Sequence, residues 1–287
     1  MTSARTTTAT VTSSDGTSIA YRRLGDGPGL VLLHGAMQSG YSNIEFARAL
    51  SGEHTCYVPD RRGRGLSGPV GDDYGVHKEV EDLDALLTAT GARDVIGISS
   101  GAVIALRTAL VRPDLRRLVA FEPPLDVDGS NATDWLGRFD REIAAGRVAA
   151  ALVTGMRGTR MGSPVFRALP RWLLERLTAT FMARQERQAE GEEPTFRALA
   201  PTLHQDALVV AETADVLDVY RSVRAEVLLL GGSRSPAYLK GALAALEPVL
   251  PSARRVELPG VDHQVTCNAA MGGRPALAAD EVRRFLA

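Results

Sequence analysis

The chain is poor in cysteine and aromatic residues, carries almost no net charge and contains no long apolar run. Its two cysteines, Cys56 and Cys267, are too few and too far apart for a zinc-ligand set or a disulfide framework. A formal net charge of -1 gives no global electrostatic reason to expect nucleic acid or an anionic membrane as a partner. Residues 1–12 are rich in Thr and Ser and lack the apolar segment of a signal peptide, and no stretch approaches the length of a membrane-spanning helix. We therefore expect a cytoplasmic protein with neither a nucleic-acid nor a membrane partner.

What is present is the composition of a globular protein. Of 287 residues, 45% are hydrophobic and 23% are charged. A chain of this length buries a large core, as one domain or as one domain with an insertion. The oligomeric state is left open by these numbers.

Apolar runs of strand length alternate with segments of helical periodicity through the first 124 residues. Strands are expected at residues 17–24, 29–33, 55–59, 95–98 and 118–121, and helices at residues 43–51, 79–90 and 102–111. Because the strands are nearly all apolar, the alternation predicts an α/β fold with a mostly parallel, doubly wound sheet covered on both faces.

The alternation stops after Pro123-Pro124 and resumes about residue 206. Residues 125–205 are helical in pattern and too long for an ordinary loop, so we interpret them as an inserted helical cap. The core then consists of a first part, residues 1–124, and a second part, residues 206–287. In the second part we expect strands at residues 226–230 and 255–258, and helices at residues 207–223, 238–250 and 275–286.

A serine flanked by glycines lies where a buried strand runs into a helix. Residues 97–101 read Gly-Ile-Ser-Ser-Gly. A strand that turns abruptly into a helix strains the residue between them, so the small Gly97 and Gly101 avoid clashes while Ser99 projects above the sheet. The first N–H groups of the helix are left to stabilise negative charge. Alone, the G-x-S-x-G pattern also fits a plain helix N-cap.

Two further segments favour a catalytic site over a simple cap. Residues 33–36, Leu-His-Gly-Ala, follow an earlier apolar strand, where a second backbone N–H could face the same oxygen. Residues 258–263, Leu-Pro-Gly-Val-Asp-His, place His263 on the loop after the last strand.

These segments, in this order, resemble the α/β-hydrolase superfamily. The resemblance covers the chain from the strand at residues 17–24 to the last helix. It includes residues 60–67, Asp-Arg-Arg-Gly-Arg-Gly-Leu-Ser, which are similar to the D-x-x-G-x-G-x-S loop of that family. The position at a strand end and the family pattern favour a structural loop over a phosphate or nucleic-acid patch.

The resemblance implies a mechanism that needs no cofactor and no metal. Ser99 is then the nucleophile and His263 the general base, and the backbone N–H groups of Ser100 and Ala36 form the oxyanion hole. Met37 is the alternative second donor, and His34 is expected to shape its own loop. A serine nucleophile argues against reactions that need an ester intermediate on an aspartate.

The usual acid of the family is absent. Its loop reads Gly-Gly-Ser-Arg-Ser-Pro at residues 231–236, with Ser235 where an aspartate is expected. Glu122, at the end of the strand after the nucleophile helix, is the best replacement, because a carboxylate at the end of an apolar strand needs a partner. A subgroup of haloalkane dehalogenases is similar in carrying a glutamate there. The alternatives are that Glu122 only orients the Pro-Pro turn, or that Asp126, Asp128 or Asp262 is the acid.

Three function classes follow. The first is a serine hydrolase acting on a carboxylic ester, thioester or related acyl compound; the others are a non-hydrolytic enzyme such as an acyltransferase or lyase, and a catalytically silent binding protein. Apolar side chains gather in the cap and predict an apolar pocket over Ser99, hence a small-molecule substrate with an apolar acyl or aromatic part. They are Trp135, Phe139, Met156, Met161, Phe166, Trp172, Phe181, Met182 and Phe196.

Overall fold

The computed structural model describes residues 6–160, 168–188, 194–214 and 216–287. In this part of the chain, eight strands form one sheet in the order β1-β2-β4-β3-β5-β6-β7-β8. The β1–β2 and β2–β4 pairs are antiparallel and the remaining pairs are parallel, so the expected mostly parallel sheet is confirmed. The strands are β1 (Thr7–Thr12), β2 (Ser18–Leu24), β3 (Gly29–Leu33), β4 (Thr55–Pro59), β5 (Asp94–Ile98), β6 (Arg117–Phe121), β7 (Glu226–Gly232) and β8 (Ala253–Leu258).

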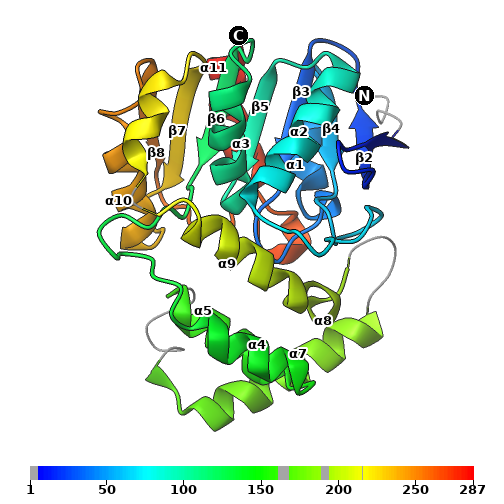
Figure 1. Ribbon diagram of the computed structural model, residues 1–287, viewed down its shortest axis with the longest axis vertical. Coiled ribbons are helices and arrows are strands. Elements are labelled where there is room, and N and C mark those ends of the chain that lie inside the picture. Colours follow the sequence, from blue (N-terminus) through cyan, green and yellow to red (C-terminus); the bar gives the residue numbers. More distant parts are fainter. Residues whose placement is uncertain (1–5, 161–167, 189–193, 215) are drawn as a thin grey trace.

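Helices cover both faces of the sheet (Figure 1). Those on one face are α2 (Val76–Thr90), α3 (Ser100–Val111) and α10 (Ala237–Leu246); those on the other are α1 (Ile44–Leu50) and α11 (Pro275–Leu286). Strand β5 illustrates why the central strands are apolar throughout. Val95 packs into the cluster under α2 and α3, whereas Ile96 and Ile98 pack under α1 and α11. Burial on both faces removes the hydrophobic alternation of a half-exposed strand.

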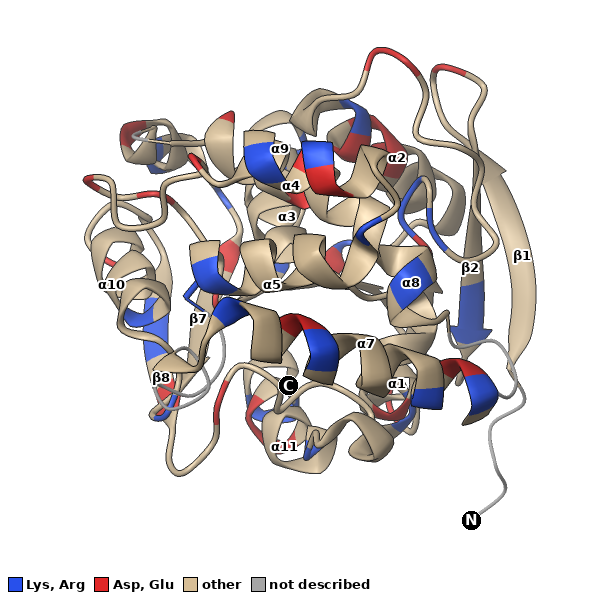
Figure 2. Cartoon of the chain, turned by 90° about the horizontal axis from the view of Figure 1, so that it is seen from below, with Lys and Arg blue, Asp and Glu red and all other residues tan. Residues whose placement is uncertain are grey.

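A second group of helices lies beyond the carboxyl ends of the strands, at the bottom of Figure 1. It comprises α4 (Leu136–Ala144), α5 (Val148–Gly158), α7 (Arg171–Gln188) and α8 (Phe196–Leu199). Helix α9 (Leu203–Ala211) lies between this group and the sheet, packed against α3 on one side and α4 on the other. Seen from below, charged residues of both signs are interspersed over these helices (Figure 2). The domain boundaries at 124/125 and 205/206 stay predictions, and the second of them falls inside α9.

Four short 3₁₀ helices complete the described elements. They are η1 (Gly40–Asn43), η2 (Ala200–Thr202), η3 (Leu217–Ser222) and η4 (Ala269–Met271). No helix in the described ranges combines the length and apolar character needed to cross a membrane. The cytoplasmic location stays a prediction.

One local expectation was wrong, and one strand was not anticipated. The single helix expected at residues 207–223 is two elements, α9 and η3, with a break between them. Just past the end of α9, the hydroxyl of Thr213 donates to the carbonyl oxygens of Val209 (2.7 Å) and Val210 (3.2 Å), which gives two carbonyls of the last turn a hydrogen-bond donor. Strand β1 was missed because its sequence is mostly threonine and alanine and its side chains are largely exposed; it forms through pairing with β2.

Candidate active site

Ser99 lies at a strained turn between β5 and α3. Its φ of 55° and ψ of -124° are backbone angles that a residue with a side chain rarely adopts. A Cβ added at Gly97 would lie 2.5 Å from the Cα of Ala102, and one added at Gly101 would lie 2.5 Å from the carbonyl oxygen of Leu33. The prediction that both flanking positions must be small is therefore confirmed.

The structure brings His263 and Glu122 together across the carboxyl edge of the sheet. His263 Nδ1 lies 2.5 Å from Glu122 Oε2, and the Glu122 side chain is fully buried at the end of β6. Its other oxygen, Oε1, accepts the backbone N–H of Gly232 at 2.6 Å. A Cβ on Gly231 would lie 3.0 Å from Oε1 and 3.2 Å from Cγ of the glutamate. The two glycines at the end of β7 thus form the surface on which this carboxylate packs.

The contact with Glu122 fixes the protonation pattern of the imidazole. A carboxylate accepts a hydrogen bond, so the proton of the neutral imidazole lies on Nδ1, which donates to Glu122, and the Nε2 lone pair is free of a proton. The ring also stacks on Phe121, with centroids 5.9 Å apart and planes 22° from parallel. Ser99 and His263 line the same cavity.

Ala36, Met37 and Ser100 also line this cavity. None of their backbone N–H groups makes a hydrogen bond to any residue that the structure describes. The neighbouring N–H groups are engaged, since that of Gly35 donates to Gln38 Oε1 at 2.9 Å and that of Ser99 to the carbonyl oxygen of Phe121 at 2.8 Å. These three N–H groups can therefore donate hydrogen bonds to a negative charge that develops on a molecule bound in the cavity.

Among the described residues, none of the other acid candidates makes a hydrogen bond or ion pair with His263. Asp126 accepts the backbone N–H of Asn131 at 2.8 Å, and Asp262 accepts that of Gln264 at 3.0 Å. Asp128 lies in a left-handed turn with φ of 52°. Ser235, where the family has aspartate, is buried and its hydroxyl has no hydrogen-bond partner among the described residues.

The cavity has a volume of about 450 Å³ and is walled by the core on one side and by the second helix group on the other. That volume lies within the usual range for small-molecule sites. Five of the expected apolar side chains line it: Trp135, Met156, Phe181, Met182 and Phe196. Phe139 is buried behind Trp135, and Trp172 is 61% exposed and does not line the cavity. Met161 and Phe166 lie outside the described residues.

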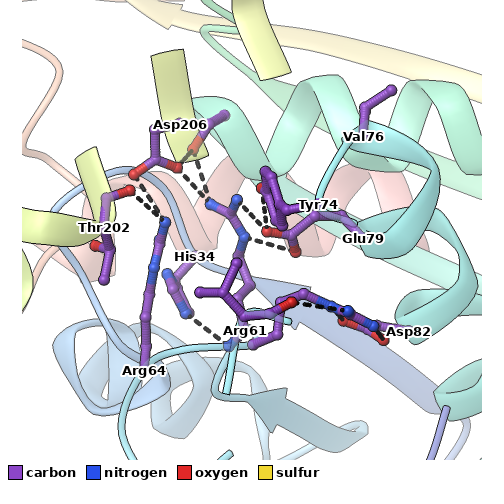
Figure 3. A network of polar contacts seen from close by, with 12 residues as sticks. His34, Arg61, Arg64, Tyr74, Val76, Glu79, Asp82, Thr202 and Asp206 are labelled. Atoms are coloured by element: carbon purple, nitrogen blue, oxygen red, sulfur yellow. Dashed lines mark hydrogen bonds and ion pairs between the residues drawn. The ribbon is translucent and has the colours of Figure 1, made fainter. Parts of the chain in front are cut away.

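The arginine-rich loop is structural, as expected. Arg61 and Arg62 are buried, and they pair with Glu79 (2.7 Å) and Asp82 (2.6 Å) of helix α2. The sequence analysis missed Asp206 on α9, whose carboxylate forms ion pairs with both Arg61 and Arg64 (Figure 3). The run of arginines indicated that carboxylate partners would be needed if the loop were buried, but not which carboxylates. Among the described residues, no group of three or more His, Cys, Asp or Glu side chains is placed to hold a metal ion.

Comparisons with known proteins agree with the fold. A family model described as "Alpha/beta hydrolase family" matches residues 30–281. The crystal structure of an alpha/beta hydrolase from Sphaerobacter thermophilus DSM 20745 is 32% identical, covers 97% of this chain and 100% of its own, and superimposes with a TM-score of 0.78. A pimeloyl-[acyl-carrier protein] methyl ester esterase of Xanthomonas campestris pv. campestris (strain B100) is 27% identical over 92% of this chain and 97% of its own length.

A further relative matches over part of its length only. The magnesium-chelatase 30 kDa subunit of Rhodobacter capsulatus is 37% identical over 139 residues, which is 47% of this chain and 48% of that protein. The family model, by contrast, spans most of the chain, from β3 into α11. The chain belongs to the alpha/beta hydrolase family of enzymes.

Proposed function

We propose that the chain is a cofactor-independent serine hydrolase that cleaves a carboxylic ester or thioester with an apolar acyl part. The observation that carries the proposal is the 2.5 Å contact between His263 Nδ1 and the buried Glu122, beside a cavity that the strained Ser99 also lines. The pairing of a general base, His263, with an acid partner, Glu122, argues against a catalytically silent binding protein, which needs neither residue. The relative that is a methyl ester esterase by name supports the same function and a carboxylic ester as the substrate class.

In the proposed reaction, Ser99 Oγ attacks the acyl carbon while His263 Nε2 takes the hydroxyl proton. Glu122 holds the ring in the Nδ1–H tautomer and stabilises the imidazolium that forms. The negative charge on the acyl oxygen is received by the N–H groups of Ser100 and of Ala36 or Met37. His263 then gives its proton to the leaving alcohol or thiol, and water releases the acid from Ser99 by the same steps in reverse order.

The substrate's acyl part is expected to lie against α5, α7 and α8. Met156, Phe181 and Phe196 present apolar surface on that side of the cavity, so transfer of an acyl chain from water is favourable there. Medium-chain or aromatic acyl groups are therefore better substrates than acetyl groups.

The test is a panel of p-nitrophenyl esters from acetate to decanoate, run with wild type and Ser99→Ala. We expect an initial burst of one nitrophenolate per chain, labelling of Ser99 by a fluorophosphonate, and loss of both in the variant. Ester turnover that survives in Ser99→Ala, or acetate turned over faster than octanoate, contradicts the proposal. Adding an alcohol or amine acceptor distinguishes hydrolysis from acyl transfer, because a transferase would give mainly the acyl-acceptor product.

A further inference from the structure

A buried network of charged side chains (Figure 3) makes hydrogen bonds to Ser100 and to the carbonyl of Gly35, next to the candidate oxyanion hole. It contains Arg61, Arg64, Glu79 and Asp206, each almost completely shielded from solvent. Two positive and two negative charges balance, and Tyr74 adds a hydrogen bond to Glu79 at 2.8 Å. The D-x-x-G-x-G-x-S pattern leaves the positions of both arginines open, so the network is a feature of this chain and not of the motif.

The carboxylate of Asp206 joins two separate loops of the site. Its Oδ1 accepts the hydroxyl of Ser100 and the Nη1 of Arg61, each at 2.8 Å, and its Oδ2 accepts the Nη2 of Arg64, also at 2.8 Å. Arg61 Nη1 in addition donates to the Ser100 hydroxyl oxygen at 3.0 Å. The first oxygen therefore fixes the start of α3, and the second fixes Arg64.

Arg64 carries the connection to the other loop. Its Nη1 donates to the carbonyl oxygen of Gly35 at 3.1 Å, and His34 Nδ1 lies 2.9 Å from the same oxygen. The carbonyl of Gly35 and the N–H of Ala36 belong to one planar peptide group, and no described peptide bond is cis. In a trans peptide these two groups point in opposite directions. Holding the Gly35 oxygen toward Arg64 therefore holds the Ala36 N–H away from it.

We propose that Asp206 is a positioning residue that aligns both backbone donors of the oxyanion hole, Ser100 through its hydroxyl and Ala36 through Arg64 and the Gly35 carbonyl. The inference rests on the proposed serine-hydrolase function, because it gives these N–H groups a developing oxyanion to bind. Asp206 itself acts through its neighbours and leaves the chemistry to Ser99 and His263.

Burial makes this alignment rigid. Burial raises the pKa of Asp206, but the positive charges of Arg64 and Arg61 outweigh it and hold the pKa at about 2, so the carboxylate is ionised throughout the neutral range. A fully paired network in a low-dielectric interior resists displacement, because moving one member leaves another charge unpaired. Preorganised donors of this kind stabilise a transition state without reorganising during the reaction.

The same helix also forms part of the cavity wall. Leu203, Ala207 and Val210 of α9 line the cavity, and so does Asp206 itself. Arg64 Nη2 further donates to the carbonyl oxygen of Thr202, just before the helix, at 3.3 Å. The wall that contacts the substrate and the carboxylate that aligns the donors are therefore parts of one rigid element.

The test compares Asp206→Asn with a matched variant, Asp82→Asn. Asp82 is also a buried carboxylate paired with an arginine of the same loop, Arg62, but neither residue lines the cavity. Steady-state kinetics with the best p-nitrophenyl ester are combined with the affinity for an alkyl boronic acid, which forms a tetrahedral adduct on the serine and mimics the oxyanion.

For Asp206→Asn we expect kcat and boronic-acid affinity each to fall by about tenfold to a hundredfold while KM changes by less than about threefold, since the N–H groups remain but lose their alignment. Asp82→Asn is expected to keep wild-type kcat. Two milder variants each remove one of the two connections from Asp206. Ser100→Ala removes the hydroxyl but keeps the backbone N–H of residue 100, and Arg64→Met removes the hydrogen bond to the Gly35 carbonyl. Each is expected to lower kcat by less than Asp206→Asn does, and Ser100→Ala keeps the test available if Asp206→Asn does not fold.

The outcomes separate the two proposals. An active wild type whose Asp206→Asn and Ser100→Ala variants match Asp82→Asn in kcat and boronic-acid affinity overturns the positioning role alone. A rise in KM with unchanged kcat also overturns it, because that pattern indicates a contact between Asp206 and the substrate instead of alignment of the donors. A wild type without Ser99-dependent ester turnover overturns the proposed function and this inference together.

Discussion

Glu122 holds His263 with one carboxylate oxygen and the backbone N–H of Gly232 with the other, at 2.5 Å and 2.6 Å. Both oxygens of the glutamate are thus committed, and in the proposed reaction its buried charge stabilises the imidazolium that forms on His263. We predict that Glu122→Gln lowers kcat by about a hundredfold or more with the fold intact, because the amide cannot stabilise that cation. The measurement is steady-state ester hydrolysis together with a thermal melt.

A matched control exists in the second helix group. Glu142 is also a buried glutamate, bound by the Thr154 hydroxyl and by Arg171, and does not line the cavity. Glu142→Gln is expected to lower the melting temperature while leaving kcat near the wild-type value. A similar kcat in Glu122→Gln and wild type would contradict the role of Glu122 as the acid partner of His263.

We further predict that adding Ser235→Asp to Glu122→Gln restores part of the lost activity. Ser235 occupies the position of the usual acid in the family pattern, and its buried hydroxyl has no hydrogen-bond partner among the described residues. The new carboxylate should find its partner in His263, because an unpaired buried charge is costly. The same kcat in the single and double variants would show that the loop after β7 no longer reaches the histidine.

The tight turn at Ser99 gives a stability prediction. Gly97→Ala places a methyl group 2.5 Å from the Cα of Ala102, so the backbone must move. We expect the free energy of unfolding to fall by about 1–3 kcal/mol. A large loss of activity should accompany it. Gly241→Ala in α10 is the control, since a Cβ there meets nothing within 4 Å. That change is expected to stabilise the protein by up to about 1 kcal/mol. Urea unfolding at neutral pH measures both, and equal effects would contradict the close-packing argument.

The shape of the cavity gives a specificity prediction. Met156→Trp fills space on the acyl side, and we expect the ratio of kcat/KM for octanoate to that for butyrate to fall by about tenfold or more, since a few methylene groups lose their apolar contact. Trp172→Ala removes an aromatic side chain of the same helix group that is 61% exposed and does not line the cavity. Its ratio should equal that of wild type. An unchanged ratio in Met156→Trp would mean that the acyl chain lies elsewhere.

The order of strands and helices was predictable from sequence because burial and turn chemistry are local signals. The contact between Glu122 and His263 was also foreseeable, since a carboxylate at the end of an apolar strand needs a partner. Asp206 was missed because its bond to Arg64 joins residues 142 positions apart, and only tertiary packing selects that partner. Similarly, the periodic pattern of residues 207–223 does not reveal that α9 ends at Ala211.

The last prediction concerns His34 and the pH dependence of stability. Burial, and then the positive charges of Arg64 and Arg61, lower the pKa of His34 well below its ordinary value of 6.5. The folded state therefore keeps the ring neutral, with its Nε2 accepting the backbone N–H of Arg61 at 3.1 Å. The unfolded chain takes up a proton on this ring below about pH 6.5, so folding is fully favoured by His34 above that pH and loses stability as the pH falls.

The expected slope from His34 is about 1.4 kcal/mol per pH unit below pH 6.5, continuing down to the lowered pKa of the folded state. In His34→Asn, whose amide can still donate to the Gly35 carbonyl, this contribution is absent. The variant should be less stable than wild type at pH 7.5, and the difference should shrink by about 2 kcal/mol on going to pH 5. The exposed His77 provides a control, because His77→Asn leaves the His34 contacts in place and should keep the wild-type slope. Urea unfolding at pH 7.5, 6.5, 5.5 and 5 measures the three curves, and parallel curves for wild type and His34→Asn would contradict a neutral, buried His34.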